Sequence, residues 1–169
     1  MNPVVYDLDG TLVSLPVDWA AARDDLAADL RDRGLDPGGR DLWDLLELTE
    51  ATDTRDRFEA VVGEHERAAA NEAPALPLAA ELGEQSGRVG VCSLNSEAAC
   101  RIALDRHGLA VDAVVGRDSL GSYKPDPEAL LATLDSMGAD PGNAVFVGDS
   151  ERDRVTAERA GVAFRWVEE

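Results

Sequence analysis

The sequence predicts an α/β fold in which a parallel β-sheet is covered by helices on both faces. Two observations indicate this fold. From about residue 78 onward, short continuous apolar stretches alternate with stretches of helical apolar spacing, a pattern typical of buried parallel strands joined by helices. Residues 15–77 contain helical stretches and no strand-like one, so we expect a small helical insertion after the first strand.

The first strand is expected at Val4–Tyr6, directly before an acidic turn. The sequence of the insertion predicts three helices. They carry apolar residues at helical spacing and are expected at residues 18–33, 41–50 and 54–71. The apolar side of the last of them is expected to carry Phe58, Val61, Val62 and His65. Pro74 and Pro77 mark the return of the chain to the main sheet.

After the insertion, strands and helices alternate to the end of the chain. Further strands are expected at residues 88–92, 113–115, 144–147 and 162–167. Helices are expected between them at residues 97–107, 126–137 and 151–160. Gly108, Gly138 and Gly161 follow these helices, as glycine commonly does at a helix C-terminus. The strands should therefore form a parallel sheet with right-handed crossovers.

The chain is strongly acidic. Its 34 Asp and Glu residues and 16 Lys and Arg residues give a net charge of −18 over 169 residues. Such a surface repels nucleic acid and anionic membranes, because both are bound through basic side chains. An acid excess with almost no lysine is typical of proteins from salt-accumulating halophiles, and we prefer this interpretation to that of an ordinary acidic cytosolic protein.

No segment indicates secretion or a membrane location. The first residues lack the basic and apolar regions of a signal peptide, and no apolar stretch is long enough to span a membrane. Cys92 and Cys100 do not make a disulfide framework, and we interpret them as small core residues. We therefore expect a cytoplasmic protein. The sequence indicates no particular oligomeric state.

Polar residues follow the predicted strands at one end of the sheet. Asp7 and Asp9 come directly after the first strand, and their spacing places both carboxylates on one face of an extended chain. Ser93 follows the strand at residues 88–92, and Asp149 follows the strand at residues 144–147. Ligands of open α/β sheets bind beyond the carboxyl ends of the strands. These segments are therefore expected to converge on one site.

Lys124 is the only lysine among the 16 basic residues of the chain. It lies between two acidic clusters in the sequence, one near Asp7 and one near Asp149. A phosphate dianion would be repelled by carboxylates alone, whereas an ammonium group and a divalent metal ion together would attract it. The sequence therefore indicates phosphoryl chemistry.

Four motifs resemble those of the haloacid dehalogenase (HAD) superfamily. They are Asp7-Leu8-Asp9-Gly10-Thr11-Leu12, Ser93 after an apolar strand, Lys124-Pro125, and Gly148-Asp149-Ser150 with Asp153. They occur in the family's order and span nearly the whole core. The resemblance implies a doubly wound, Rossmann-like parallel sheet with a cap inserted after the first motif. Residues 1–14 and 78–169 would form the catalytic core, and residues 15–77 would form a small helical cap.

The resemblance also implies a phosphatase mechanism that depends on Mg²⁺. Asp7 would be the nucleophile that forms an aspartyl-phosphate, and Asp9 would act as general acid and base. Oxygen atoms of Asp7, Asp149 and Asp153 would hold Mg²⁺, with Asp9 contributing its backbone carbonyl. Whether Asp153 binds the metal directly or through water stays open.

The remaining site residues implied by the resemblance would bind the phosphoryl group. Ser93 and the backbone amides that follow it, at Leu94 and Asn95, would bind phosphate oxygens, with the Asn95 side chain assisting. Lys124 would neutralise charge on the phosphoryl group and on the nucleophile. The expected substrate is a small phosphomonoester. The core looks similar to that of phosphoglycolate phosphatases, although the insertion is shorter than their caps usually are.

Several of these residues also have simpler interpretations. Asp7 and Asp9 could be turn residues before a glycine. Ser93 could be a helix cap, or Ser96 or Asn95 could cap the next helix instead. Asp149 and Asp153 could stabilise the start of a helix through its dipole.

Other residues are interpreted as structural. His65 and His107 are expected to be packing or surface residues. The insertion's arginines are expected to be surface charges, although one of them could reach a substrate carboxylate. They are Arg23, Arg55 and Arg57.

Two alternative functions stay open. The first is a phosphomutase of the same superfamily, which is disfavoured because members with this type of cap use a basic cap residue and this insertion has no lysine. The second is a non-catalytic, receiver-like phospho-acceptor domain. The pair Asp7 and Asp9 followed by Gly-Thr, together with the long helical insertion, disfavours it. Asp9 also argues against a dehalogenase, since family dehalogenases lack this second acid.

Overall fold

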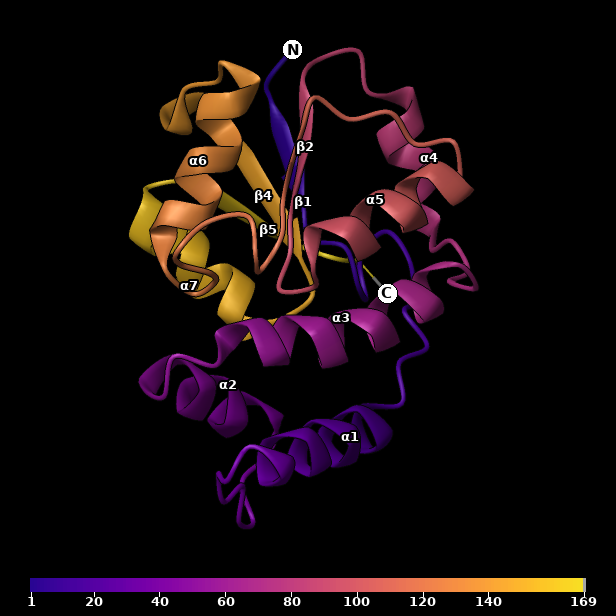
Figure 1. The fold of residues 1–169 in the computed structure, drawn as a ribbon. Helices are drawn as coiled ribbons and strands as arrows, with labels where there is room; N and C mark the ends of the chain where they lie inside the picture. Colours follow the sequence, from indigo (N-terminus) through magenta and orange to yellow (C-terminus); the bar gives the residue numbers. More distant parts are fainter. Residues whose placement is uncertain (169) are drawn as a thin grey trace.

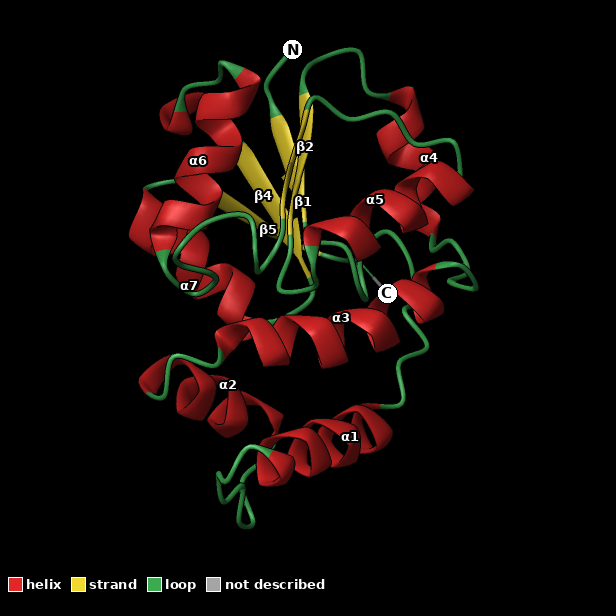
Figure 2. Ribbon diagram, viewed as in Figure 1, coloured by secondary structure: helices red, strands yellow, loops and turns green. Residues whose placement is uncertain are grey.

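A parallel sheet, helices on both of its faces and a further helical layer make up the fold in the computed structural model, which describes residues 1–168 (Figures 1 and 2). The elements in chain order are β1 Val4–Tyr6, α1 Trp19–Asp32, α2 Leu42–Ala51, α3 Arg55–Ala70, α4 Pro77–Glu84, β2 Val89–Cys92, α5 Glu97–Arg106, β3 Ala113–Val115, α6 Pro127–Met137, the 3₁₀ turn η1 Pro141–Asn143, β4 Val145–Gly148, α7 Glu151–Ala160 and β5 Ala163–Trp166.

The strands pair in the order β3-β2-β1-β4-β5, and every pair is parallel. Strands β2 and β3 are therefore added on one side of β1, and β4 and β5 are added on the other side. This is the doubly wound arrangement that the family resemblance implied. Tyr6 lies in register with Val91 of β2 and Val147 of β4. This register brings the carboxyl ends of three strands level, so the residues that follow them lie side by side.

Apolar side chains cover both faces of the sheet, so all three residues of the central strand β1 are buried. Tyr6 lies in the core cluster that includes Leu82 of α4 and Leu104 of α5. Val5 points to the opposite face, into the cluster that includes Leu134 of α6 and Ala157 of α7. Figure 1 shows α4 and α5 on one side of the sheet and α6 and α7 on the other.

Helices α1, α2 and α3 form the further layer, beyond the carboxyl ends of the strands (Figure 1). They have a hydrophobic cluster of their own, which includes Leu30 of α1, Leu45 of α2 and Phe58 of α3. The end of α3 differs, because Ala69 and Ala70 pack in the cluster of the sheet. Helix α3 is therefore shared between the helical layer and the sheet.

Short polar residues begin many of the helices, as their sequence indicates. The side chains of Asp18 and Asp41 accept hydrogen bonds from backbone amides in the first turns of α1 and α2. Ser96 does the same for α5, and Ser150 for α7. Such N-caps satisfy amide groups that have no partner inside the helix. They fix where each helix starts and thus the length of the loop before it.

Two expectations about the helices were wrong. Residues 77–84 form helix α4, with Pro77 in its first turn, where the sequence predicts only a return segment. Its eight residues are too few for a clear helical period. In α3, His65 lies near the surface and contacts Asp25 at 2.7 Å, whereas Glu66 is fully buried. The buried face follows Phe58, Val62 and Glu66, which are four residues apart.

None of the helices in residues 1–168 combines the length and the apolar character that a membrane span needs.

Candidate functional site

The loop after β1 places two aspartates differently. Asp7 is buried, and its Oδ2 accepts a hydrogen bond of 3.4 Å from Thr11 Oγ1. Asp9 is only half-buried, and its Oδ1 accepts a hydrogen bond of 2.9 Å from Leu15 N. Gly10 directly follows Asp9 and has a φ angle of +83°, a backbone conformation that glycine adopts without strain. The loop thus holds one carboxylate inside the site and the other near its mouth.

Lys124 joins two acidic segments that are far apart in the sequence. Its Nζ donates hydrogen bonds to Asp7 Oδ1 at 2.9 Å and to Asp153 Oδ1 at 2.6 Å. Burial lowers the pKa of this lysine, but the adjacent carboxylates outweigh burial and hold the pKa above its ordinary value. Lys124 therefore stays charged. It also lies 5.5 Å from the centre of the Phe146 ring.

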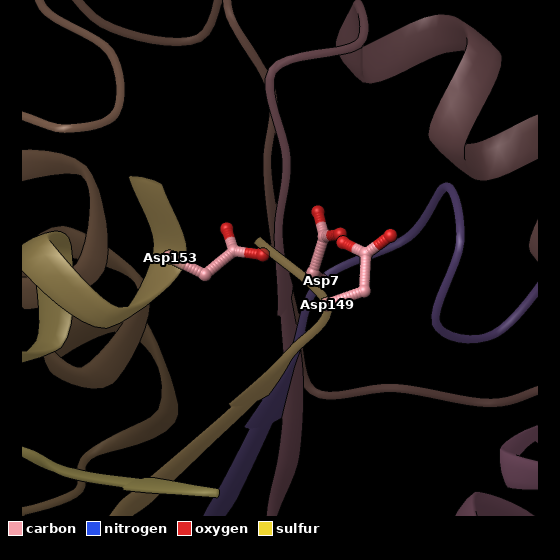
Figure 3. A group of neighbouring side chains, drawn as sticks. All are labelled: Asp7, Asp149 and Asp153. Carbon is pink, nitrogen blue, oxygen red and sulfur yellow. The ribbon is translucent and has the colours of Figure 1, made fainter. Parts of the chain in front are cut away.

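Asp7, Asp149 and Asp153 form a carboxylate triad. Each offers an oxygen atom, and these atoms lie within 4.8 Å of one another. Figure 3 shows Asp149 beside Asp7, and Asp153 facing them from α7. Burial raises the pKa of Asp7, Lys124 opposes this effect, and the negative charge of Asp153 adds to it. The single ammonium group therefore does not balance the negative charge gathered here.

The triad has the donor set that Mg²⁺ requires. Carboxylate oxygens are the hard ligands that this ion prefers. Among residues 1–168, Oδ2 of Asp153 is buried without a hydrogen-bond partner, and a buried acceptor of this kind is costly unless something binds it. The Asp9 carboxylate is not part of the group. Any contribution of Asp9 to a metal ion would come from its backbone carbonyl.

Ser93, Leu94 and Asn95 form a tight loop after β2. Ser93 Oγ donates to Asn95 Oδ1 and accepts from Asn95 N, both at 3.0 Å. Ser96, and not Asn95, caps helix α5. Ser150 caps α7. The simpler capping role considered for Asn95 therefore falls to its neighbour.

A buried charge network, which the sequence did not predict, supports this loop from the helical layer. Asn95 Nδ2 donates to Glu66 Oε2 at 3.0 Å. Arg117, which is fully buried, donates to both Glu66 oxygens and, at 2.9 Å, to the Leu94 carbonyl. It also pairs with Glu59 at 2.8 Å. The four-residue spacing of Glu66 from Val62 was the only sequence signal for it.

The site opens into a cavity of about 160 Å³ between the sheet and the helical layer. Its lining residues are Asp7, Asp9, Trp19, Trp43, Leu94, Asn95, Lys124, Asp149, Ser150, Arg152 and Asp153. The predicted site residues thus meet here, apart from Ser93, which lies just behind the wall at 3% exposure. Helices α1 and α2 contribute two tryptophans. Arg152 comes from α7.

The arginines of the insertion do not line this cavity. Arg57 pairs with Asp29 at 2.7 Å, and Arg55 pairs with Glu50 and Glu59 at 2.9 and 3.0 Å. Arg23 donates to the backbone carbonyls of residues 38 and 40. Arg23 and Arg57 therefore stay within the helical layer. Arg55 also reaches the core, where it donates to the Arg117 carbonyl at 3.4 Å and lies 5.4 Å from the centre of the Tyr123 ring.

Comparison with known proteins decides the family. Residues 45–167 match the family model of haloacid dehalogenase-like hydrolases. The chain belongs to this family. A phosphoglycolate phosphatase of Rhodospirillum rubrum is 37% identical over 94% of this chain and 76% of that protein. A phosphoglycolate phosphatase of Aquifex aeolicus is 29% identical over 95% of this chain and 82% of that protein. The chain is thus a HAD hydrolase of the phosphatase type, and the resemblance drawn from the four motifs is confirmed.

Solved structures confirm the fold. The HAD phosphatase of Thermococcus onnurineus has a TM-score of 0.67 and 24% identity, covering 99% of this chain and 86% of that one. CbbY of Rhodobacter sphaeroides, solved with xylulose-1,5-bisphosphate, has a TM-score of 0.71 and 17% identity, covering 100% of this chain and 87% of that one. The α/β fold with a doubly wound parallel sheet is therefore the HAD fold.

The approach of Asp149 to the loop after β1 allows a first test. A Cβ atom on Gly10 would lie 2.0 Å from Asp149 Oδ2, and the φ of +83° disfavours any other residue. We expect Gly10→Ala to displace the Asp149 carboxylate and to lower kcat/KM for phosphomonoesters by at least about 10²-fold, since displacements of about 1 Å have effects of this size. The measurement is steady-state kinetics, with circular dichroism to check folding.

Gly83→Ala in helix α4 is the matched control, because a Cβ there meets no atom within 4 Å. Its activity should equal that of the wild type. Near-normal activity of Gly10→Ala would contradict a need for Asp149 at this position.

Proposed function

We propose that the protein is a Mg²⁺-dependent phosphatase that hydrolyses small phosphomonoesters through an aspartyl-phosphate on Asp7. The observation that carries this proposal is the contact of the only lysine with two members of the carboxylate triad, at 2.9 Å from Asp7 and 2.6 Å from Asp153. This contact supports a site for an anionic group beside a site for a divalent cation. Phosphoryl transfer requires both.

In the first half of the reaction, a carboxylate oxygen of Asp7 forms a bond to phosphorus, and the bond from phosphorus to the leaving oxygen breaks. Asp9 donates its proton to that leaving oxygen. Burial raises the pKa of Asp9, opposed by the hydrogen bond from Leu15 N, and a raised pKa favours the protonated form that an acid needs. The product alcohol then leaves through the cavity mouth.

In the second half, Asp9 accepts a proton from a water molecule whose oxygen attacks the phosphorus of the aspartyl-phosphate. The bond between phosphorus and the Asp7 oxygen breaks, which releases inorganic phosphate and restores the carboxylate. Two displacements at one carboxylate replace one more difficult direct displacement by water.

The proposed metal ligands are the carboxylates of Asp7, Asp149 and Asp153 and the backbone carbonyl of Asp9. When bound, Mg²⁺ would neutralise charge on the phosphoryl group and on the carboxylates. The four aspartates carry up to four negative charges and the substrate adds about two. Lys124 alone could not hold the substrate against this repulsion.

The proposed phosphate-binding residues are Ser93, Leu94, Asn95 and Lys124. The Ser93 hydroxyl and the amides of the two residues after it would bind phosphate oxygens. Ser93 Oγ would release its bond to Asn95 Oδ1 to do so. Asn95 itself is held by Glu66, which keeps this loop in place while the hydroxyl turns. Lys124 would stabilise the developing negative charge from the opposite side.

Residues 15–77 are proposed to act as the cap over the core formed by residues 1–14 and 78–169. Trp19 and Trp43 of this segment line the cavity, which supports a role in choosing the leaving group. The names of the relatives make 2-phosphoglycolate one substrate to test. The net charge of −18 further suggests a cytoplasm rich in salt as the working environment.

The test is phosphate release from p-nitrophenyl phosphate and a panel of small phosphomonoesters, measured with Mg²⁺ and with EDTA. It should be run in low and in multimolar KCl, because salt screens the self-repulsion of an acidic chain. We expect hydrolysis with Mg²⁺ and its loss in EDTA. A folded protein that hydrolyses no ester in either salt would refute the phosphatase and favour the phosphomutase or a non-catalytic receiver-like role.

Binding of inorganic phosphate gives a readout that does not depend on turnover. Titration calorimetry should show weak binding in EDTA and tighter binding with Mg²⁺, because the metal ion offsets the repulsion between phosphate and the triad. Equal affinity with and without Mg²⁺ would contradict the assignment of the triad as a metal site.

A further inference from the structure

Arg152 occupies a distinctive place at the mouth of the site. It lies in the first turn of α7, next to Asp153, and it lines the cavity of about 160 Å³ that contains Asp7. It also lines an adjoining cavity of about 110 Å³, which Trp43, Leu94 and Lys124 share with the first. Its side chain therefore stands where the two spaces meet.

Packing against an aromatic ring holds this arginine in place. The Arg152 guanidinium carbon lies 5.4 Å from the centre of the Trp43 ring. This distance is within the range of a cation–π interaction between a guanidinium and an indole ring. The contact also connects α7 of the core to α2 of the helical layer, so the helical layer helps to hold the guanidinium at the mouth.

The guanidinium of Arg152 has no carboxylate partner within residues 1–168, although the chain is rich in acids. Its neighbour Arg154, two residues later, pairs with Glu151 and Glu158. The arginines of the insertion are likewise engaged, Arg55 and Arg57 with carboxylates and Arg23 with backbone carbonyls. Arg152 is therefore the cation at this mouth that retains hydrogen-bonding capacity.

The charges that line the cavity indicate what Arg152 could bind. The cavity is lined by four aspartates and by two cations, Lys124 and Arg152. Lys124 is buried and already donates to Asp7 and Asp153, next to the proposed nucleophile. Any second anionic group on a substrate would have to extend toward the mouth, past the half-buried Asp9. Without a cation there, that group would be repelled.

We propose that Arg152 binds a second anionic group on the leaving-group side of the substrate, and that the enzyme therefore prefers phosphomonoesters that carry a carboxylate or another phosphate. This inference rests on the proposed phosphatase function. The planar fork of the guanidinium fits either anion through two parallel hydrogen bonds. Since Arg152 lies at an exposed mouth, the anion keeps part of its hydration, and the preference should be moderate.

The test compares substrates that differ in one group. 2-Phosphoglycolate carries a carboxylate, ethylene glycol bisphosphate carries a second phosphate, and 2-hydroxyethyl phosphate carries a neutral hydroxyl in the same place. We expect the wild type to prefer at least one of the two anionic esters in kcat/KM by about 10- to 100-fold, the scale of a hydrogen bond to a charged group. Arg152→Gln should lose that preference, mainly through a higher KM for the anionic ester.

Arg154→Gln is the matched control, because Arg154 lies on the same helix, is partly exposed and pairs with surface glutamates. It should keep the wild-type preference. Arg152→Lys should restore part of it, because lysine keeps the charge but lacks the planar fork. The larger of the two wild-type preferences identifies the anion as carboxylate or phosphate. Equal preferences in the wild type and in Arg152→Gln would overturn the inference.

Failure of the proposed function would be visible separately, as a lack of hydrolysis of all three esters by the wild type. In that case, titration calorimetry with the same esters tests Arg152 directly. Tighter binding of an anionic ester than of 2-hydroxyethyl phosphate, lost in Arg152→Gln, would support the inference. Equal binding of the three esters by the wild type would overturn it.

Discussion

Asp7→Asn is expected to abolish hydrolysis of phosphomonoesters, with a loss on the order of 10⁶-fold, the scale seen when a hydrolase loses its nucleophile. An amide does not attack phosphorus as a carboxylate does, and the triad with Asp149 and Asp153 loses one of its negative charges. The measurement is phosphate release at saturating Mg²⁺, followed over hours so that a small residual rate can be detected.

The fold should survive this substitution. Burial raises the pKa of Asp7, which means that folding disfavours its charged form. Lys124 keeps its contact with Asp153 at 2.6 Å when Asp7 becomes neutral. Asp105→Asn, at an exposed position on α5, is the control and should be fully active. Retained activity in Asp7→Asn would show that another group is the nucleophile.

Arg117→Met is expected to lower the free energy of unfolding by about 3–5 kcal/mol, the cost of leaving a buried charge without its partner. Arg117 is fully buried, and it holds Glu66, which is also fully buried, and Glu59. The pKa of Glu59 lies below its ordinary value because hydrogen bonds from Arg117 and Arg55 outweigh the effect of burial. Without the guanidinium, the fully buried Glu66 carboxylate loses its charge partner.

Urea denaturation at constant high KCl measures this loss. Arg101→Met is the control, because the ion pair of Arg101 with Glu97 is largely exposed and should contribute under about 1 kcal/mol. Replacing the network as a whole, with Arg117→Met, Glu66→Leu and Glu59→Leu together, should recover much of the stability. A loss in Arg117→Met no larger than in Arg101→Met would show that the buried network does not stabilise the fold.

The same variants should separate stability from catalysis. Arg117 donates to the Leu94 carbonyl, and Glu66 accepts from Asn95, so the network positions the proposed phosphate-binding loop. The variant with all three substitutions is therefore expected to fold while having a lower kcat/KM. The helical layer would then contribute to the chemistry through this loop, in addition to covering the cavity.

Local sequence already contained the core of the site. Asp7 and Asp9 at the end of a buried strand, Ser93 after the next one and Asp149 after another were predicted to converge, because parallel strands place their carboxyl ends at one edge. The only lysine indicated where an anion would bind. Each inference used spacing and residue type within a short segment. The parallel sheet, with β1 between β2 and β4, then brings these segments together at one edge.

Tertiary structure alone decided what surrounds that site. Glu66 and Arg117 are 51 residues apart, and charged side chains in a sequence are ordinarily expected at the surface. Apart from the four-residue spacing of Glu66 from Val62, nothing local indicated that they meet in the core. The contact of Arg152 with the Trp43 ring likewise joins two elements that only the fold brings together. Period and spacing thus determined the strands and the position of the aspartates that follow them. The pairing of buried charges and the wall of the cavity depend on contacts across the chain, and these exist only once the helical layer has packed onto the sheet.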